Sequence, residues 1–241
     1  MNPEIYHLLS EAVEQKKDVK LINTYRSVPV STNGQIIELH GNEARITTSL
    51  LQIICGRNQN ISYINIGFQT LIARVTNSDL NEGSIDFSDF EICNNHIGKR
   101  KFIRVEPDNL LKAQITSPEF NPDDQGQDKW FNAWLVDLSI HGAAIYVHPL
   151  IFNKATLGEG DSACLKFNLT NPGETSANQV ELKAVIRNTT SIEDKYIRIG
   201  LETNPDPASE NFLTSYVAHL QKKIIKELRE KLDRDRPVTR V

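Results

Sequence analysis

The chain has few of the residues that cross-link small folds, with only three cysteines among its 241 residues, at positions 55, 93 and 164. They are far apart and show no C-x-x-C spacing, so we expect neither a disulfide framework nor a metal site. Long apolar runs are also missing, and none approaches the roughly 20 residues that a membrane-spanning helix needs. The first twenty residues lack the apolar core of a secretory signal. These absences predict a cytoplasmic protein that is not inserted in a membrane.

Neither sign of charge is in large excess, because the chain has 27 Lys and Arg and 31 Asp and Glu, which gives a net charge of −4. Residues 1–96 carry 7 basic and 11 acidic side chains, and residues 105–241 carry 16 and 20. Only residues 97–104 (IGKRKFIR) are purely basic, with four cations and no acid. An otherwise acidic chain repels a polyanion, so we expect no general binding of DNA or RNA. The basic cluster is either a solvated loop or a local site for an anion.

Short segments of alternating hydrophobicity dominate the first part of the chain, after one amphipathic helix expected over residues 3–15. Turn signals at Asn33-Gly34, Gly41-Asn42 and Asn81-Glu82-Gly83 separate these segments. Short strands at this spacing predict a small antiparallel barrel or sandwich. The expected strands are Val19–Ile22, Gln35–Leu39, Ala44–Thr48, Leu51–Ile54, Ser62–Ile66, Leu71–Val75 and Ser84–Phe87.

A second set of short strands follows residue 104, with a polar hairpin loop over residues 117–129 and no internal sequence repeat. A helix of roughly seven turns is expected from Ser209 to about Arg234. Its aliphatic stripe is too long to leave in water, so it covers either its own barrels or a second copy of the chain. Of the two we favour a homodimer. The expected strands are Leu111–Ile115, Ala133–Leu138, Ala143–Val147, Ala163–Leu169, Gln179–Asn188 and Tyr196–Glu202, and the stripe comprises Leu213, Val217, Leu220, Ile224, Leu228 and Leu232.

Two motifs stand out near the middle of the chain. Arg100 and Arg104 form R-x-x-x-R in the basic cluster, and Asp137, Ser139 and Gly142 form D-x-S-x-x-G between two expected strands. At ordinary residue frequencies the first spacing arises by accident in roughly half of chains this long, but the second in only about one in fifteen. The two motifs together are informative because R-x-x-x-R precedes D-x-S-x-x-G around one strand-rich module.

These motifs resemble those of the PilZ family, receptors for cyclic-di-GMP (c-di-GMP) built on a six-stranded barrel. GKRKFIRV (98–105) is similar to the family's opening motif, LVDLSIHGAAI (135–145) to its second motif, and YIRIGLE (196–202) to its closing strand. By architecture and position, the preceding residues resemble the barrel domain of YcgR-like flagellar-brake proteins. The resemblance implies a mainly β fold of two small antiparallel β-barrel domains, the first split-barrel-like, plus a long C-terminal helix. It divides the chain into residues 1–96, a basic hinge 97–104, a PilZ barrel 105–205, and a helix and tail 206–241.

The residue types of the two motifs suit the ligand that the resemblance implies. An Arg fork pairs with phosphate oxygens, reads the O6/N7 edge of guanine and stacks on a purine, which explains two arginines at fixed spacing. Asp137 suits the N–H donors of a guanine edge. Ser139 either donates to a phosphate or holds the turn, and Gly142 allows a positive φ and a close approach of the backbone. Lys99, beside the first Arg, either stacks near a second ligand molecule or is simply solvated.

Structural readings compete with each of these roles. The arginines could be a solvated linker, and Asp137 and Ser139 could only shape a hairpin through Asx and Ser turns. A catalytic triad is another interpretation, because an acid, a hydroxyl and an imidazole follow at every second position in Asp137, Ser139 and His141. On a strand, however, they would lie about 6.6 Å apart, too far for the 2.6–3.2 Å contacts of a triad. We therefore expect a protein that is not an enzyme.

We accordingly expect a bacterial, cytoplasmic c-di-GMP receptor with no metal and no further cofactor. Ligand binding at residues 97–104 and Asp137–Gly142 would select one orientation of the two barrels. The output would be control of a protein partner such as flagellar motor or other envelope machinery, in motility or biofilm regulation. The alternative is an adaptor on a PilZ scaffold that no longer depends on the nucleotide.

Overall fold

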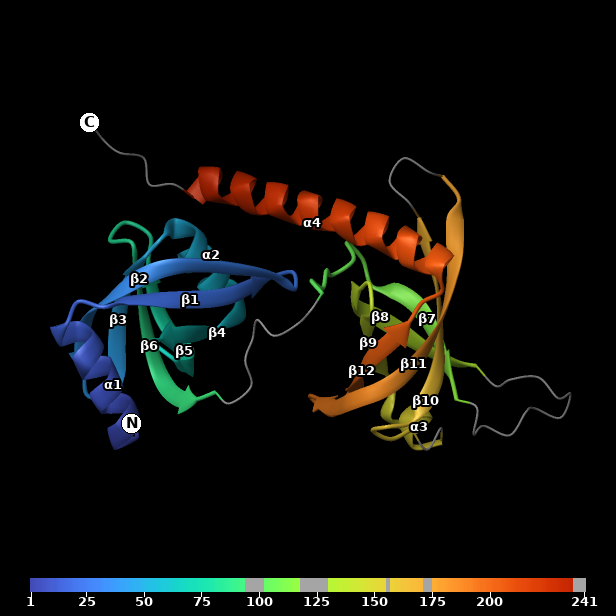
Figure 1. The fold of residues 1–241 in the computed structure, drawn as a ribbon, viewed down its shortest axis with the longest axis horizontal. Coiled ribbons are helices and arrows are strands. Elements are labelled where there is room, and N and C mark those ends of the chain that lie inside the picture. The colour runs from blue at the N-terminus through green and yellow to red at the C-terminus, as the bar shows by residue number, and fades with distance from the viewer. Residues whose placement is uncertain (94–101, 118–129, 155–156, 171–174, 236–241) are drawn as a thin grey trace, which may run out of the picture. The chain divides into compact units, whose positions relative to one another are not determined.

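The chain folds into two compact units, each of which contains one closed, six-stranded antiparallel barrel (Figure 1). A computed structural model describes residues 1–93, 102–117, 130–154, 157–170 and 175–235. The first unit comprises Met1–Lys101 with Ile224–Val241, and the second comprises Phe102–Lys223. The predicted mainly β fold of two small barrels and a C-terminal helix is therefore confirmed.

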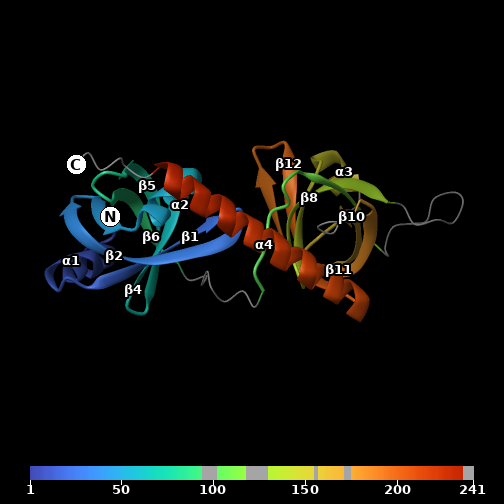
Figure 2. The same ribbon diagram turned by 90° about the horizontal axis from the view of Figure 1, so that it is seen from above.

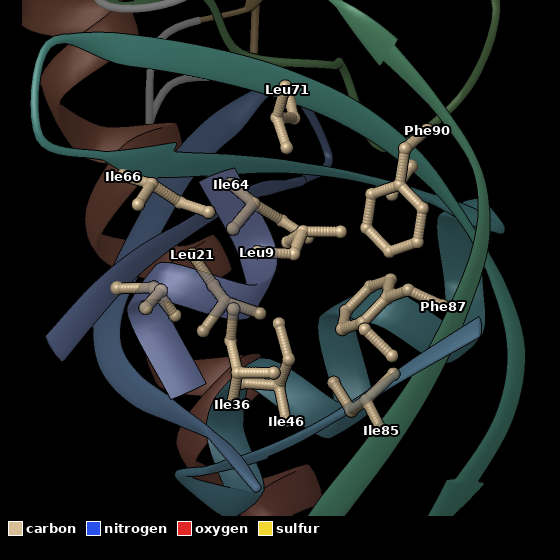
Figure 3. Packing of buried hydrophobic residues seen from close by; sticks show 14 of the residues in the cluster. Leu9, Leu21, Ile36, Ile46, Ile64, Ile66, Leu71, Ile85, Phe87 and Phe90 are labelled. Atoms are coloured by element: carbon tan, nitrogen blue, oxygen red, sulfur yellow. The ribbon is translucent and has the colours of Figure 1, made fainter. Parts of the chain in front are cut away.

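The first barrel surrounds an aliphatic core that an N-terminal helix helps to close. The predicted first helix is confirmed as α1 (Pro3–Glu14), where the Asn2 side chain accepts a hydrogen bond from the backbone N–H of Glu4 at 2.9 Å. Leu9 of α1 is fully buried and lies among strand residues such as Leu21 and Ile64 (Figure 3). The strands close in the order β1-β2-β3-β6-β5-β4. They are β1 (Asp18–Tyr25), β2 (Val28–His40), β3 (Glu43–Thr48), β4 (Ile61–Ile66), β5 (Gln69–Asp79) and β6 (Ser84–Ile92).

The strand expected over Leu51–Ile54 was wrong, because this segment is part of helix α2 (Leu50–Gln59). Ser49 caps the helix by accepting a hydrogen bond from the backbone N–H of Gln52, and Asn60 ends it with a left-handed φ of 56°. The continuous apolar run fits either structure, and only the cap residues decide for the helix. As a helix it turns Ile53 toward the barrel core.

The hairpin turn expected at Asn33-Gly34 was also wrong, because β2 passes straight through it. The chain turns earlier, at Arg26 and Ser27, whose φ angles of 49° and 65° form the turn between β1 and β2. Gly34 is instead required by packing. A Cβ there would lie 2.6 Å from the carbonyl oxygen of Thr47 and 2.7 Å from Leu21 Cδ1.

The second barrel repeats the topology of the first. Its closing order is β10-β11-β12-β9-β8-β7, which is the same order as in the first barrel when each is numbered from its own first strand. Each barrel also has its helix between the third and fourth strands, α2 in the first and α3 (Pro149–Lys154) in the second. The repeat thus lies in topology and is invisible in the sequence. The strands are β7 (Leu111–Thr116), β8 (Phe131–Ser139), β9 (Gly142–Val147), β10 (Ser162–Thr170), β11 (Ala177–Ile192) and β12 (Tyr196–Asn204).

The predicted C-terminal helix is confirmed as α4 (Pro207–Asp235), a single continuous helix (Figure 2). Five positions of its aliphatic stripe, from Leu213 to Leu228, are buried within the chain, and Leu228 contacts Ile54 and Cys55 of α2. The stripe is therefore covered within the chain, and the homodimer stays a prediction. Among the described helices, none is both long and apolar enough to cross a membrane.

Candidate functional site

A bulge in β8 prepares the outer surface of the second barrel. Leu135 pairs with Ile145 of β9, but the next paired residue is Asp137, opposite Ala144, so one extra residue stands between them. Side chains of a regular strand alternate between its faces, and the extra residue resets this alternation. Trp134 and Asp137, three residues apart, therefore both lie on the outer face, while Leu135 is buried inside.

Arg104 reaches this face because the segment before β7 pairs with the end of β8. The backbone N–H of Val105 donates to the carbonyl of Leu138 at 2.9 Å, and the N–H of Leu138 donates back at 3.0 Å. Val105 is fully buried, which fixes its neighbour Arg104 beside Asp137. The Nη1 of Arg104 donates to Oδ1 of Asp137 at 2.9 Å. The structure thus joins one residue from each of the two predicted motifs.

A second guanidinium approaches the same carboxylate from β12. The Nη2 of Arg198 donates to Oδ2 of Asp137 at 2.6 Å. The side chain of Asp137 is only 5% exposed, whereas those of Arg104 and Arg198 are 20% and 27% exposed. The two guanidiniums balance the charge of this buried carboxylate, and the trio keeps one net positive charge at the surface. Asp137 therefore orients two arginines, a role that the sequence analysis did not assign.

Small residues lie beside this trio on the outer face. Asp137 pairs with Ala144, and Ala144 pairs with Gly200 of β12, so the row continues across three strands with almost no side chain. Arg198, two residues from Gly200, lies on the same face. The sequence analysis missed Arg198 because 61 residues separate it from Asp137. The only local signal was its place in the YIRIGLE segment.

Gly142 matters for its small size and not for its backbone angle. The expectation of a positive φ was wrong, since Gly142 opens β9 with an ordinary strand pairing to Ser139 and Glu202. A Cβ at this position would lie 3.2 Å from Arg104 Nη2 and 3.2 Å from Ser139 Oγ. The expected close approach therefore involves the guanidinium of Arg104.

The hydroxyl of Ser139 is already occupied within the chain. It is buried and donates to the carbonyl oxygen of Gly142 at 3.1 Å, which closes the hairpin between β8 and β9. Of the two roles considered for Ser139, this is the turn-holding one. Lys99 and Arg100, the remaining predicted site residues, lie outside the described residues.

The triad reading is not supported by the geometry of its three members. The imidazole of His141 lies 4.5 Å from the ring of Phe102, and its Nε2 is 3.6 Å from Oε1 of Glu210. Asp137 is paired with arginines and Ser139 with a backbone carbonyl. Within the described part of the chain, no three His, Cys, Asp or Glu side chains gather as they would around a metal ion. The arrangement can hold an anion with N–H donors, and it contains no nucleophile activated by a base.

No family model and no curated protein matches the chain, but solved structures do. The inhibitor of motility MotI/DgrA of Bacillus subtilis matches with a TM-score of 0.44 and 16% identity, over 86% of this chain and 97% of that one. YcgR of Escherichia coli in complex with c-di-GMP matches with a TM-score of 0.42 and 12% identity, over 95% and 93%. The PilZ domain of YcgR with c-di-GMP matches with a TM-score of 0.38 and 19% identity, over 56% and 98%. At these identities and TM-scores, function must be inferred from the site residues.

Proposed function

We propose that this protein is a receptor for c-di-GMP and that the ligand binds on the outer face of the second barrel. The observation that carries the proposal is the pairing of Arg104 and Arg198 with one buried carboxylate, Asp137. The pairing holds both guanidiniums in place and, among the described residues, occupies one N–H group of each. The small residues Ala144 and Gly200 lie beside them in the same strand rows.

The chemistry of the ligand matches this surface. Each c-di-GMP molecule carries two phosphates and two guanines, and a guanidinium can serve either group. Arg104 and Arg198 supply the described cations, and Lys99 and Arg100 are proposed to add further contacts from the basic segment. Asp137 uses one lone pair on each oxygen for an arginine, so an acceptor site remains for a guanine N–H donor.

Calorimetry with c-di-GMP tests the proposal. We expect binding to the wild type, and a roughly ten- to hundredfold weaker affinity for Arg104→Ala, because a charge-assisted contact contributes about 1.5–3 kcal/mol. Arg74→Ala is a matched control, since this arginine of the first barrel also pairs with a carboxylate, Asp89, at 3.4 Å. A folded wild type that shows no binding at tens of micromolar would refute the receptor.

We further propose that the ligand selects one orientation of the two barrels. The support is the position of the basic motif, since residues 97–104 connect the first barrel to Val105 and Arg104 pairs with Asp137 in the proposed ligand site. X-ray scattering and limited proteolysis, with and without saturating ligand, test this step. If the scattering and proteolysis profiles do not change with ligand while calorimetry shows normal binding, the change of orientation is refuted and the receptor function is not.

The proposed output is control of a protein partner in the cytoplasm, such as flagellar or other envelope machinery. The acidic balance of both halves outside residues 97–104 favours a protein partner over DNA or RNA. The alternative, a nucleotide-independent adaptor, predicts the same partner binding with and without c-di-GMP. A pull-down with a candidate partner at both ligand conditions separates the two.

A further inference from the structure

We infer that Trp134 and Tyr146 form a stacking platform for a guanine base beside the arginine site. This inference rests on the proposed function, since it names the part of c-di-GMP that an otherwise unassigned surface would hold. It goes beyond the two motifs, because neither residue belongs to R-x-x-x-R or to D-x-S-x-x-G.

The platform residues lie in one row across three neighbouring strands. Trp134 of β8 pairs with Tyr146 of β9, and Tyr146 pairs with Arg198 of β12. Their neighbours Leu135, Ile145 and Ile199 are buried in the barrel, so the row itself lies on the outer face. Two strand spacings separate its ends, which is about 10 Å. The cation that pairs with Asp137 is therefore the last member of an aromatic row.

The indole of Trp134 is the exposed ring of this row, and Tyr146 is half-buried beside it. Trp134 is 38% exposed. Tyr196, which lies two residues before Arg198 on β12, is 40% exposed. The rings of Tyr146 and Tyr196 stack with their centroids 5.8 Å apart and an interplanar angle of 23°, so the two tyrosines pack against each other next to Trp134 and Arg198. Exposed Trp and Tyr on a rigid strand offer a large contact area at a small entropy cost. Purine bases stack on such rings whatever their hydrogen-bonding edge.

The first barrel shows that the fold does not require aromatic residues here. Its topology and the pairing of its second, third and sixth strands are the same, so the equivalent row can be read from the register. In that row Gln35 pairs with Thr47 and Thr47 pairs with Ser84, three residues without a ring. The rings on the second barrel are therefore explained by what the surface binds and not by the architecture.

Calorimetry with c-di-GMP on Trp134→Leu and Tyr146→Leu tests the platform. Each variant is expected to bind about tenfold more weakly than the wild type, which corresponds to about 1.4 kcal/mol. Trp134→Phe and Tyr146→Phe keep a ring and should stay within about threefold. The matched control is Trp130→Leu, because this second tryptophan lies just before β8, against Lys166 at 5.0 Å, and outside the row.

A fluorescence measurement keeps the test decisive if a Leu variant fails to fold. The chain has two tryptophans, so Trp130→Phe leaves Trp134 as the only one. Saturating c-di-GMP should quench its emission, because a stacked guanine contacts the indole directly. Wild-type binding with unchanged Trp134 emission and unchanged affinity of Trp134→Leu would overturn the platform and leave the receptor intact. Absence of wild-type binding would instead refute the receptor itself.

Discussion

The two barrels are built alike, but they treat the same position on their outer face in opposite ways. Each has a bulge in its second strand, between Ile36 and Glu38 in the first barrel and between Leu135 and Asp137 in the second. The register then aligns Glu38 with Asp137. The equivalent rows are Glu38, Arg45 and Asp86 in the first barrel and Asp137, Ala144 and Gly200 in the second.

In the first barrel the central residue of this row, Arg45, balances the negative charges of the two acidic residues beside it. Arg45 Nε donates to Oδ1 of Asp86 at 2.7 Å, and its Nη1 lies 3.7 Å from Oε2 of Glu38. The hydrogen bond from Arg45 holds the pKa of Asp86 below its ordinary value, although burial opposes this. The guanidinium thus lies over the row and is used within the chain.

In the second barrel the central residues are small, and the guanidiniums come from the sides. Arg104 precedes the paired residue Val105, and Arg198 lies two residues before Gly200 on β12. Within the described part of the chain, each gives one of its five N–H donors to Asp137. The comparison teaches that one fold carries either a closed ion pair or the proposed anion site, depending on where its arginines originate.

The strongest test moves the arginine of the first barrel into the second. Ala144→Arg places a guanidinium at the position equivalent to Arg45, where it should pair with Asp137 and displace Arg104. We expect the affinity for c-di-GMP to fall by more than about a hundredfold, since more than one charge-assisted contact is lost. Calorimetry measures the loss, and circular dichroism checks the fold. Ala144→Gly, which adds no side chain at this buried position, should bind like the wild type; equal binding by Ala144→Arg would contradict the comparison.

Much of this architecture could be predicted because barrel strands alternate between faces. Residues 61–66 alternate regularly between buried and less buried positions, and the predicted strand there was confirmed. The prediction failed over residues 50–59, where a continuous apolar run has no period to distinguish strand from helix. It failed again at Asn33-Gly34, where glycine serves close packing between strands and not a turn.

The candidate site was predictable only as far as its residues are close in sequence. Asp137, Ser139 and Gly142 fall within one hairpin, so their motif marks one place on the fold. Arg198 joins Asp137 through barrel closure, which no local spacing reveals. Likewise, the bulge that turns Trp134 to the outer face is a property of the pairing with β9 and leaves no mark in the sequence.

A smaller effect is expected from glycine substitutions that separate packing from backbone strain. Gly142→Ala introduces a Cβ 3.2 Å from Arg104 Nη2, so the guanidinium must shift and binding should weaken about tenfold. Gly160→Ala meets no atom within 4 Å but has a φ of +94°, so it should lower the free energy of unfolding by about 1 kcal/mol and leave binding unchanged. Calorimetry measures the effect on binding, and urea unfolding measures the effect on stability. A Gly142→Ala variant with wild-type affinity would show that ligand binding does not depend on the close packing of Arg104 against Gly142.

The smallest effect is expected in the first barrel, where the closed ion pair serves stability alone. Because the pKa of Asp86 is lowered in the folded state, its stabilisation is present at neutral pH and is lost as the pH falls through that pKa. Asp86→Asn should therefore lower the free energy of unfolding by about 1 kcal/mol at pH 7 and converge with the wild type in acid.

Urea unfolding across pH measures this difference for each unit. Both tryptophans lie in the second barrel, so their fluorescence follows that unit while circular dichroism follows the whole chain. Asp89→Asn is the control, because its side chain is 63% exposed and lies 3.4 Å from Arg74, a pair from which we expect almost no effect. Calorimetry should find c-di-GMP binding unchanged in both variants. If Asp86→Asn weakened ligand binding as much as Gly142→Ala, the row of the first barrel would take part in the site and the contrast between the barrels would be wrong.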